Sequence, residues 1–308
     1  MAAPWLWVVF TLIAAGAQTV RNAMQRELTA ALGTLGATHV RFLFGFPFAL
    51  MFLAGLTLST GAPLPQPKWP FWAWVLDGSG AQIAATALML KAMGERSFVV
   101  TIAYIKTEPI QVAIFGLIFL GDEVTWPMAI AIVVATAGVV LMSIPHPSLP
   151  RLRGREGWGQ VGGPRPTLLG LGSGGMFALS AIGYRGAILS LGLPNYTMSA
   201  TFTLAVGLVV TTAMLSLYLV LRTPDVLFAI VRAWKPSLFA GFTGAFASQF
   251  WFLAFALTSA ANVRTLALVE VLFAQLVARF AFGQRTSGRE AIGMALVVAG
   301  VGLLIWTY

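Results

Sequence analysis

The chain has 308 residues, of which 58% are hydrophobic and 9% are charged, and its formal net charge is +9. A soluble domain carries roughly 25% charged residues, and a chain this apolar could not cover a water-facing surface with polar atoms, so lipid is the solvent that fits it. The absence of cysteine excludes disulfides and thiolate metal sites, and two histidines are too few for a typical zinc site, so no metal or cofactor is expected.

Apolar segments of about 20 residues, each long enough to cross a bilayer as a helix, follow one another along the whole chain. Turn or charge signals separate them, for example in Gly61–Lys68, Gly121–Glu123 and Gly192–Asn195. The sequence therefore predicts an all-α membrane protein of about ten transmembrane helices. The expected spans are residues 4–24, 35–58, 70–91, 97–120, 126–144, 167–190, 195–221, 235–257, 261–282 and 288–307.

The two halves of the chain repeat one another. Glu108, Gly121 and Gly138 recur as Glu270, Gly283 and Gly300 at a constant offset of 162 residues. A charged residue inside a span is rare, so the matched glutamates carry most of the weight. We expect a first five-helix repeat over 1–145, a basic polar linker over 146–166 and a second five-helix repeat over 167–308.

An odd number of spans in each half gives the halves opposite polarity, which is the inverted repeat common in secondary transporters. Lys and Arg concentrate near the odd-numbered loops, and the positive-inside rule makes those loops cytoplasmic and both termini external. The count places Arg21, Arg185 and Arg264 near loops. The same rule assigns the basic excess to membrane-flanking loops, so no nucleic-acid partner is expected.

Polar side chains inside spans need a partner, a water-filled cavity or a function, because lipid cannot solvate them. Four of them form one face of the fourth span, at spacings of three, four and three: Thr101, Tyr104, Glu108 and Gln111. Pro109 predicts a kink beside this face. The further candidates for the binding or coupling site are Gln18, Asn22, His39, Asp77, Gln82, Lys106, Gln249, Trp251, Arg264 and Glu270.

A structural role competes with a functional one for these charges. The carboxylates of Asp77, Glu108 and Glu270 could neutralise Lys106, Arg264 or His39 and only hold helices together. Four other basic residues are expected to extend toward a membrane interface with their heads in water: Arg41, Lys91, Arg185 and Arg279.

Motifs of other functions are weak in this chain. Gly170–Gly175 matches a dinucleotide-binding pattern, but it opens an apolar span rather than a βαβ unit, so helix packing by small residues is the better interpretation. No Walker lysine motif and no clustered catalytic constellation is present, so no catalytic residues are assigned. A membrane-embedded enzyme or a channel remains the less favoured alternative.

The repeated frame resembles the drug/metabolite transporter superfamily, in the group with two EamA-type repeats. In the second half the resemblance lies in Ala256–Asn262, Glu270 and Gly283, and in the first half it lies in Glu108-Pro109, Gly121–Glu123 and Ala137-Gly138. The N-terminal half is most similar to bacterial YddG-type exporters, in Gln18–Ala23 and His39–Gly45. Two departures are Val271 in place of proline and Gln284 where a glutamate is common.

The resemblance implies an inner-membrane exporter of aromatic and other neutral amino acids with a central cavity, working by alternating access. Glu108, with Asp77 or Glu270, is then the candidate for carrying a proton or holding the substrate ammonium. Lys106 or Arg264 would hold the carboxylate. The expected partners are a small-molecule substrate, the lipid bilayer and protons. Drugs, sugars and nucleotide derivatives are the alternative substrates.

Overall fold

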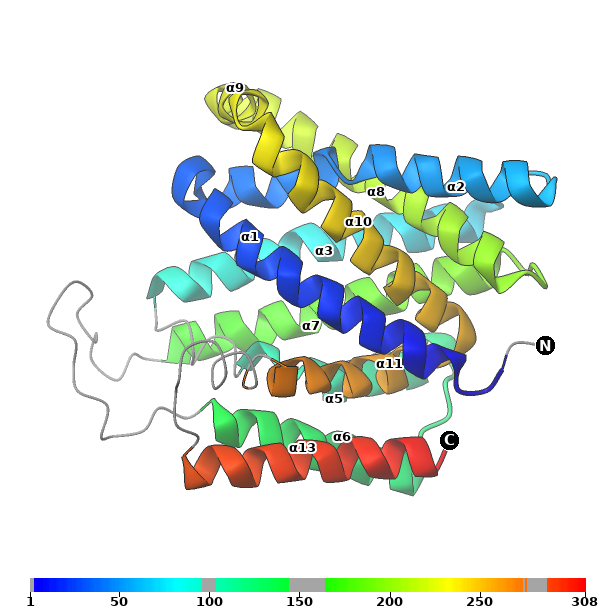
Figure 1. Ribbon diagram of the computed structural model, residues 1–308, viewed down its shortest axis with the longest axis vertical. Coiled ribbons are helices and arrows are strands. Elements are labelled where there is room, and N and C mark those ends of the chain that lie inside the picture. The colour runs from blue at the N-terminus through cyan, green and yellow to red at the C-terminus, as the bar shows by residue number, and fades with distance from the viewer. Residues whose placement is uncertain (1–2, 96–103, 144–163, 274, 276–286) are drawn as a thin grey trace, which may run out of the picture.

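The computed structural model describes residues 3–95, 104–143, 164–273, 275 and 287–308, and every regular element in these ranges is a helix (Figure 1). Arg279, Gly283, Gln284 and most of the expected linker lie outside the described residues. The elements are α1 (Leu6–Leu43), α2 (Phe46–Thr60), α3 (Trp69–Glu95), α5 (Glu108–Phe115), η1 (Gly116–Leu120), α6 (Trp126–Met142), α7 (Pro164–Ser190), α8 (Tyr196–Arg222), α9 (Pro224–Arg232), α10 (Trp234–Leu257), α11 (Ala260–Leu266), η2 (Ala267–Val269) and α13 (Gly288–Trp306).

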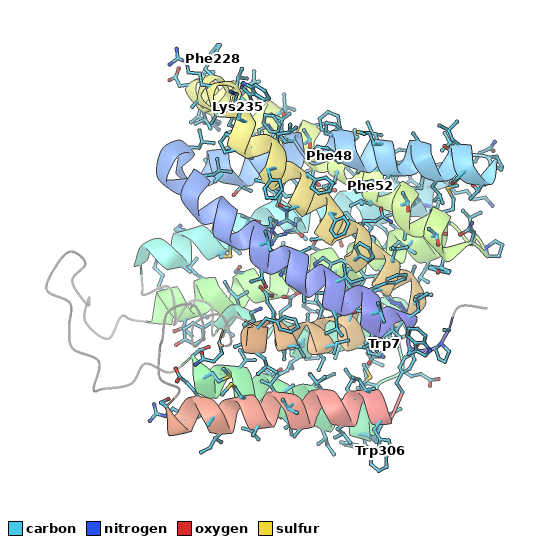
Figure 2. All side chains as sticks on the ribbon, viewed as in Figure 1. Trp7, Phe48, Phe52, Phe228, Lys235 and Trp306 are labelled. Carbon is cyan, nitrogen blue, oxygen red and sulfur yellow. The ribbon has the colours of Figure 1, made fainter. Side chains whose placement is uncertain are left out.

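Within the described residues, five helical segments are long and apolar enough to cross a membrane: Leu35–Thr60, Thr167–Ser190, Tyr196–Arg222, Trp234–Leu257 and Gly288–Trp306. Three shorter apolar helices accompany them: Leu6–Arg21, Glu108–Leu120 and Trp126–Met142. Large apolar side chains such as Phe228 and Trp306 project from the outside of the molecule, as a lipid-facing surface requires (Figure 2). The count of about ten spans stays a prediction.

The first helix is longer than the sequence analysis expects. Instead of ending near residue 24, α1 continues to Gly33, whose φ of 65° and ψ of 179° break it into two helical segments. Residues 24–32 are rich in Met, Gln, Arg, Glu, Ala and Leu, which are strong helix formers. They therefore continue the first helix beyond its expected end. Glycine alone adopts a positive φ without strain, so the break falls at Gly33.

Helix α9 was not expected, because residues 222–234 were assigned to a loop. Pro224 starts this nine-residue helix at a position where a missing N–H costs nothing, and Asp225 lies in its first turn, near the positive end of the helix dipole. Ile230 is buried against the second segment of α1. The short helix therefore joins α8 to α10 and packs on α1.

Both repeat-matched glutamates follow an interruption of helical structure. Lys106 and Thr107 form a turn, and α5 begins at Glu108 with Pro109 in its first turn. The expected continuous face is therefore broken before Glu108, because Pro109 has no N–H for the carbonyl of Ile105 and its ring clashes with that carbonyl. Glu270 likewise follows the 3₁₀ helix η2.

The most extensive helix pairings are α3 with α7, α1 with α10, and α6 with α13, and the last pair lies side by side at one edge of the molecule (Figure 1). Glycines permit their close approach, as small residues do between membrane helices. A Cβ added at Gly183 would lie 2.6 Å from the backbone nitrogen of Gly78, and one at Gly300 would lie 2.6 Å from that of Ala135.

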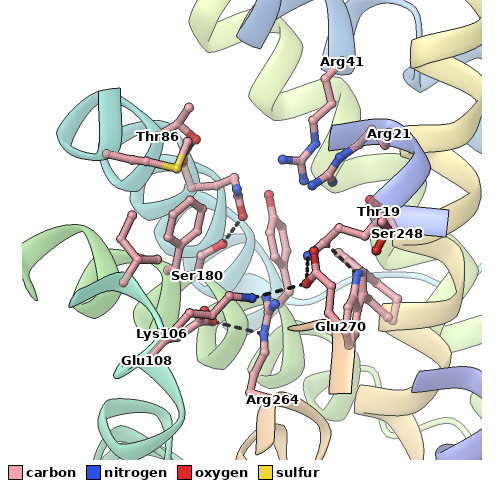
Figure 3. A pocket seen from close by; sticks show the side chains of 18 of the residues that line it. Thr19, Arg21, Arg41, Thr86, Lys106, Glu108, Ser180, Ser248, Arg264 and Glu270 are labelled. Carbon is pink, nitrogen blue, oxygen red and sulfur yellow. Dashed lines mark hydrogen bonds and ion pairs between the residues drawn. The ribbon is translucent and has the colours of Figure 1, made fainter. Parts of the chain in front are cut away.

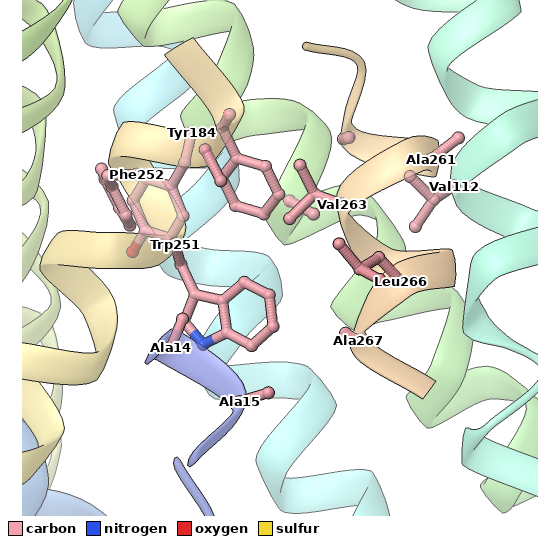
Figure 4. Packing of buried hydrophobic residues seen from close by; sticks show 14 of the residues in the cluster. Ala14, Ala15, Val112, Tyr184, Trp251, Phe252, Ala261, Val263, Leu266 and Ala267 are labelled. Atoms are coloured by element: carbon pink, nitrogen blue, oxygen red, sulfur yellow. The ribbon is translucent and has the colours of Figure 1, made fainter. Parts of the chain in front are cut away.

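The largest buried cluster lies where α1, α5, α7, α10 and α11 meet (Figure 4). The rings of Tyr184 of α7 and Phe252 of α10 pack at a tilt of 44° with their centroids 4.9 Å apart, and Val263 and Leu266 come from α11. Trp251 lies at the edge of this cluster and turns its indole toward α1 (Figure 4). This apolar packing supports the wall of the site described next.

Candidate functional site

A cavity of about 490 Å³ lies among helices α1, α3, α5, α7, α8, α10 and α11. This size is within the range of small-molecule sites, which are mostly apolar with a few placed polar groups. Its apolar wall is largely aromatic, with Phe177, Trp251, Phe252 and Phe255. Its polar wall includes six of the predicted site residues: Gln18, Gln82, Lys106, Glu108, Arg264 and Glu270.

One polar chain crosses the cavity through Glu270. The Lys106 ammonium and the Gln18 side-chain amide both donate to Glu270 Oε2, at 3.3 Å and 3.2 Å. Gln18 Oε1 in turn accepts from the Trp251 indole N–H at 3.1 Å. The turn before α5, helix α1 and helix α10 are thereby connected through one carboxylate (Figure 3).

A second ion pair joins α5 to α11. Glu108 Oε1 and Arg264 Nε are 3.2 Å apart. The Arg264 guanidinium carbon lies 5.1 Å from the centroid of the Trp251 ring, a distance at which a cation interacts with the π face. Trp251 therefore contacts the second ion pair through its ring and is linked to the first through Gln18.

Two arginines that the sequence analysis placed elsewhere also line the cavity. Arg41 was expected at a membrane interface and Arg21 was counted near a loop, but both side chains extend into the cavity (Figure 3). Both expectations were wrong because the face of α1 that carries these residues packs against α10, where both stems lie beside Gly244. Among the described lining residues there are thus four cationic groups and two carboxylates.

Gln82 lies on the opposite wall, on α3. The Ser180 hydroxyl is 2.9 Å from Gln82 Oε1 and 2.9 Å from the backbone oxygen of Gly78, so it donates to one of these two acceptors. The contact ties α7 to α3 beside the cavity. The neighbouring Thr86 also lines the cavity, and its hydroxyl donates to the backbone oxygen of Gln82 at 2.9 Å.

Other candidates lie outside the cavity lining. Asp77 is exposed on α3, and its carboxylate approaches Gly183. Tyr104 packs on Gly170, and Gln111 donates to the backbone oxygen of Leu171 at 3.4 Å. All three side chains contact α7. For Tyr104 and Gln111 the reason is the break at Lys106 and Thr107, which changes the helical register that had placed them on the face of Glu108.

The remaining candidates contact α8. Gln249 donates to the Thr201 hydroxyl at 2.8 Å, and His39 is buried with its Nε2 3.0 Å from the Ser216 hydroxyl. Both are contacts between neighbouring helices. The side chain of Asn22 lies outside the described residues.

Arg185 does not extend to a membrane interface as expected. Its guanidinium donates to Asp122 Oδ1 at 2.9 Å and to the Thr258 backbone oxygen at 2.8 Å, tying α7 to the loop before α6 and to the end of α10. Burial raises the pKa of the Asp122 carboxyl above its usual value, an effect that Arg185 opposes.

Removing the charge of Asp122 should destabilise the protein, because a buried cation left without its partner costs about 3–5 kcal/mol. We expect Asp122→Asn to lower the thermal unfolding temperature of the purified protein in detergent. Glu123→Gln removes the same charge from the exposed neighbouring position and serves as the control. Equal unfolding temperatures for the two variants would show that the Arg185 contact contributes little.

Sequence reasoning offered pairing among these charges but did not say which carboxylate holds which cation, and it missed the direction of two arginines. The signal for Arg41 was its position inside an apolar span, where a charge is rare. The signal for Arg21 was its place one helical turn after Gln18. Phe252 and Phe255 carry no sequence signal that separates them from ordinary packing residues, whereas Ser180 lies at the repeat offset of 162 residues from Gln18.

Comparison with known proteins assigns a family to the first half. Residues 5–144 match the EamA-like transporter family. No curated protein matches the sequence. A solved structure described only as the crystal structure of a protein matches with a TM-score of 0.69 at 16% identity, covering 99% of this chain and 96% of that one. That likeness shows that the fold is shared over nearly the whole chain.

The family match and the apolar helices together support a multi-pass membrane protein. The EamA family consists of transporters rather than enzymes, and it suggests a drug/metabolite transporter with a small-molecule substrate in a lipid bilayer. Residues 5–144 are therefore similar to an EamA-like transporter domain of the drug/metabolite transporter superfamily.

Proposed function

We propose that the protein is a secondary transporter that exports aromatic and other neutral amino acids across a bacterial inner membrane by alternating access at its cavity. The observation that carries the proposal is a cavity among apolar helices whose polar groups are joined by two ion pairs. In each pair one partner precedes the central linker and the other follows it. A movement of one half against the other must therefore act on both pairs.

The helix packing supports two inverted five-helix repeats, over 1–145 and 167–308. With the offset of 162 residues, α1 corresponds to α7 and α3 to α10, so the pairing of α1 with α10 corresponds to that of α7 with α3. In the α6–α13 pair, Gly138 approaches Gly293 and Gly300 approaches Ala131. Gly138 and Gly300 are 162 residues apart, and so are Ala131 and Gly293, so the repeat offset converts one contact into the other. An inverted repeat requires this relation.

The cavity lining supports the same relation. Gln18 and Ser180, Thr86 and Ser248, and Glu108 and Glu270 are pairs separated by 162 residues, and all six line the cavity. Inverted-repeat transporters place their substrate at the interface of the repeats, near the middle of the bilayer. The cavity is therefore the proposed substrate site, and rocking of the repeats about it is the proposed transport motion.

The aromatic wall supports an aromatic amino acid as substrate. Trp251, Phe252 and Phe255 supply a large apolar surface, and the ion pairs supply charges for a zwitterion. Glu108 and Glu270 are the proposed proton carriers, because neutralising either carboxylate would release its cation. Another class of metabolite is the alternative, and the excess of cationic groups in the lining favours an anionic one.

Uptake of radiolabelled amino acids into liposomes that contain the purified protein tests the proposal. We expect saturable uptake of tryptophan or phenylalanine, competed by unlabelled neutral amino acids and changed by an imposed pH gradient. Absence of uptake of every amino acid by vesicles that hold folded protein would contradict the substrate class and direct the search to drugs, sugars and nucleotide derivatives.

The proposed orientation, with both termini outside, keeps the support of the basic residues near the odd-numbered loops. Arg21, Arg185 and Arg264 lie within helices rather than in loops, and two of them, Arg185 and Arg264, were counted on the opposite side. The chain has no cysteine, so single cysteines test the orientation directly. We expect a membrane-impermeant maleimide to label Thr307→Cys in spheroplasts and to label Asp225→Cys only after permeabilisation. The opposite labelling pattern would invert the topology.

A further inference from the structure

The clearest unassigned feature of the cavity is its pair of arginines. Arg21 and Arg41 come from the two segments of α1 on either side of the Gly33 break, and their guanidinium groups point toward one another (Figure 3). Their stems rest against the same glycine: a Cβ added at Gly244 would lie 3.4 Å from Arg41 Cγ and 3.6 Å from Arg21 Cδ. Both α1 segments and α10 therefore place two like charges in one part of the cavity.

Among the described lining residues, cations outnumber carboxylates. The carboxylates of the lining each hold another cation, since Glu108 pairs with Arg264 and Glu270 with Lys106. Arg21 lies within electrostatic range of Glu270 as well as of Arg41. Even if Glu270 interacts with both Lys106 and Arg21, the described lining contains four cationic groups and two carboxylates, which leaves two positive charges in excess. An anion in the cavity would relieve this repulsion, which is strong where water is scarce.

The groups around the arginines suit an oxyanion. A guanidinium presents its N–H groups in a planar fork that matches the two oxygens of a carboxylate. The Ser248 hydroxyl lies on the same wall and can donate a further hydrogen bond (Figure 3). The Thr19 hydroxyl beside it donates to the backbone oxygen of Ala15 at 3.0 Å. The aromatic wall around Trp251 borders the same cavity, where it can receive the apolar part of the ligand.

We infer that Arg21 and Arg41 form the subsite that binds the carboxylate of the transported solute, an inference that rests on the proposed transport function. It reassigns a role that the sequence analysis gave to Lys106 or Arg264, because those two cations are held by glutamates. The cavity then selects solutes that carry a carboxylate next to an apolar or aromatic body, and it discriminates against the corresponding amines.

A matched pair of ligands tests this subsite on the full-length protein. Tryptophan and tryptamine differ only in the carboxylate, and their dissociation constants can be measured by calorimetry in detergent. We expect tryptamine to bind about 10- to 100-fold more weakly than tryptophan, the range for a lost charge-assisted contact. In Arg41→Gln the affinity for tryptophan should fall to that of tryptamine, whereas the affinity for tryptamine should not fall.

Two further variants control for folding and for net charge. Arg41→Lys keeps the charge but not the planar fork, so it should fold and recover part of the discrimination. Arg222→Gln removes one positive charge from an exposed position at the end of α8, and it should bind both ligands as the unmodified protein does. Loss of discrimination in Arg222→Gln would contradict a local role for Arg41.

The outcomes separate this inference from the proposed function. If the folded protein transports tryptophan but binds tryptophan and tryptamine equally, the subsite is wrong and the transport proposal stands. If neither binds but indole-3-acetate binds in an Arg41-dependent manner, the carboxylate subsite stands and the amino-acid substrate is wrong. If no carboxylate shows binding that depends on Arg41, the subsite is overturned.

Discussion

Glu270→Gln should reduce substrate uptake into liposomes by at least about 100-fold and should lower the thermal unfolding temperature. Glu270 Oε2 accepts from both Lys106 and Gln18, so the neutral amide leaves the Lys106 ammonium without its counter-ion inside the membrane domain. Removing one partner of a buried ion pair costs about 3–5 kcal/mol, which corresponds to more than two orders of magnitude in an equilibrium constant.

The double variant Lys106→Gln with Glu270→Gln separates a structural role from a transport role. Removing both charges leaves no uncompensated ion, so the unfolding temperature should return toward that of the unmodified protein. Uptake should stay low if Glu270 carries the coupled proton or acts on the substrate. Recovery of uptake together with stability would identify Glu270 as a structural counter-ion, and Glu123→Gln controls for the loss of an exposed carboxylate.

Gly300→Ala should destabilise the protein by about 1–3 kcal/mol, although alanine normally stabilises a helix relative to glycine. The added Cβ would lie 2.6 Å from the backbone nitrogen of Ala135 and 2.7 Å from the backbone oxygen of Ala131, so the α6 and α13 backbones must separate. Gly138→Ala should act in the same way from the other helix, because its Cβ would lie 2.6 Å from the Gly293 oxygen.

Gly302 provides the matched control for this prediction. It lies on the same helix as Gly300, it is exposed, and a Cβ added there would meet nothing within 4 Å. Gly302→Ala should therefore leave the unfolding temperature unchanged or raise it. If Gly300→Ala and Gly302→Ala have equal unfolding temperatures in detergent, the close α6–α13 contact does not contribute to stability.

The sequence by itself determined the local structure of much of the chain. Low charge and apolar segments of bilayer length dictate helices, because a backbone in lipid must satisfy its own hydrogen bonds. The glycines at the expected breaks, Gly61, Gly121 and Gly192, all adopt positive φ, which glycine tolerates without steric cost. The break beside Glu108 follows from Pro109 in the same local way.

The sequence also indicated which buried charges matter, but not what each one contacts. Helical periodicity predicts the face of a helix on which a residue lies, but it does not identify the neighbouring helix that packs against that face. Lys106 and Glu270 are far apart in sequence, and only the packing of α1, α10 and α11 around the turn before α5 brings them together.

Tertiary structure alone decided the direction of the arginines. A long arginine near a helix end can extend to the membrane interface or fold inward, and sequence position favours neither. For Arg41 the inward direction depends on the packing of α1 against α10 beside Gly244, and for Arg185 it depends on Asp122 in a distant loop. The free energy of a charge in a membrane protein is set by the groups that surround it in space, which is why the cavity's surplus of positive charge became apparent only in the folded chain.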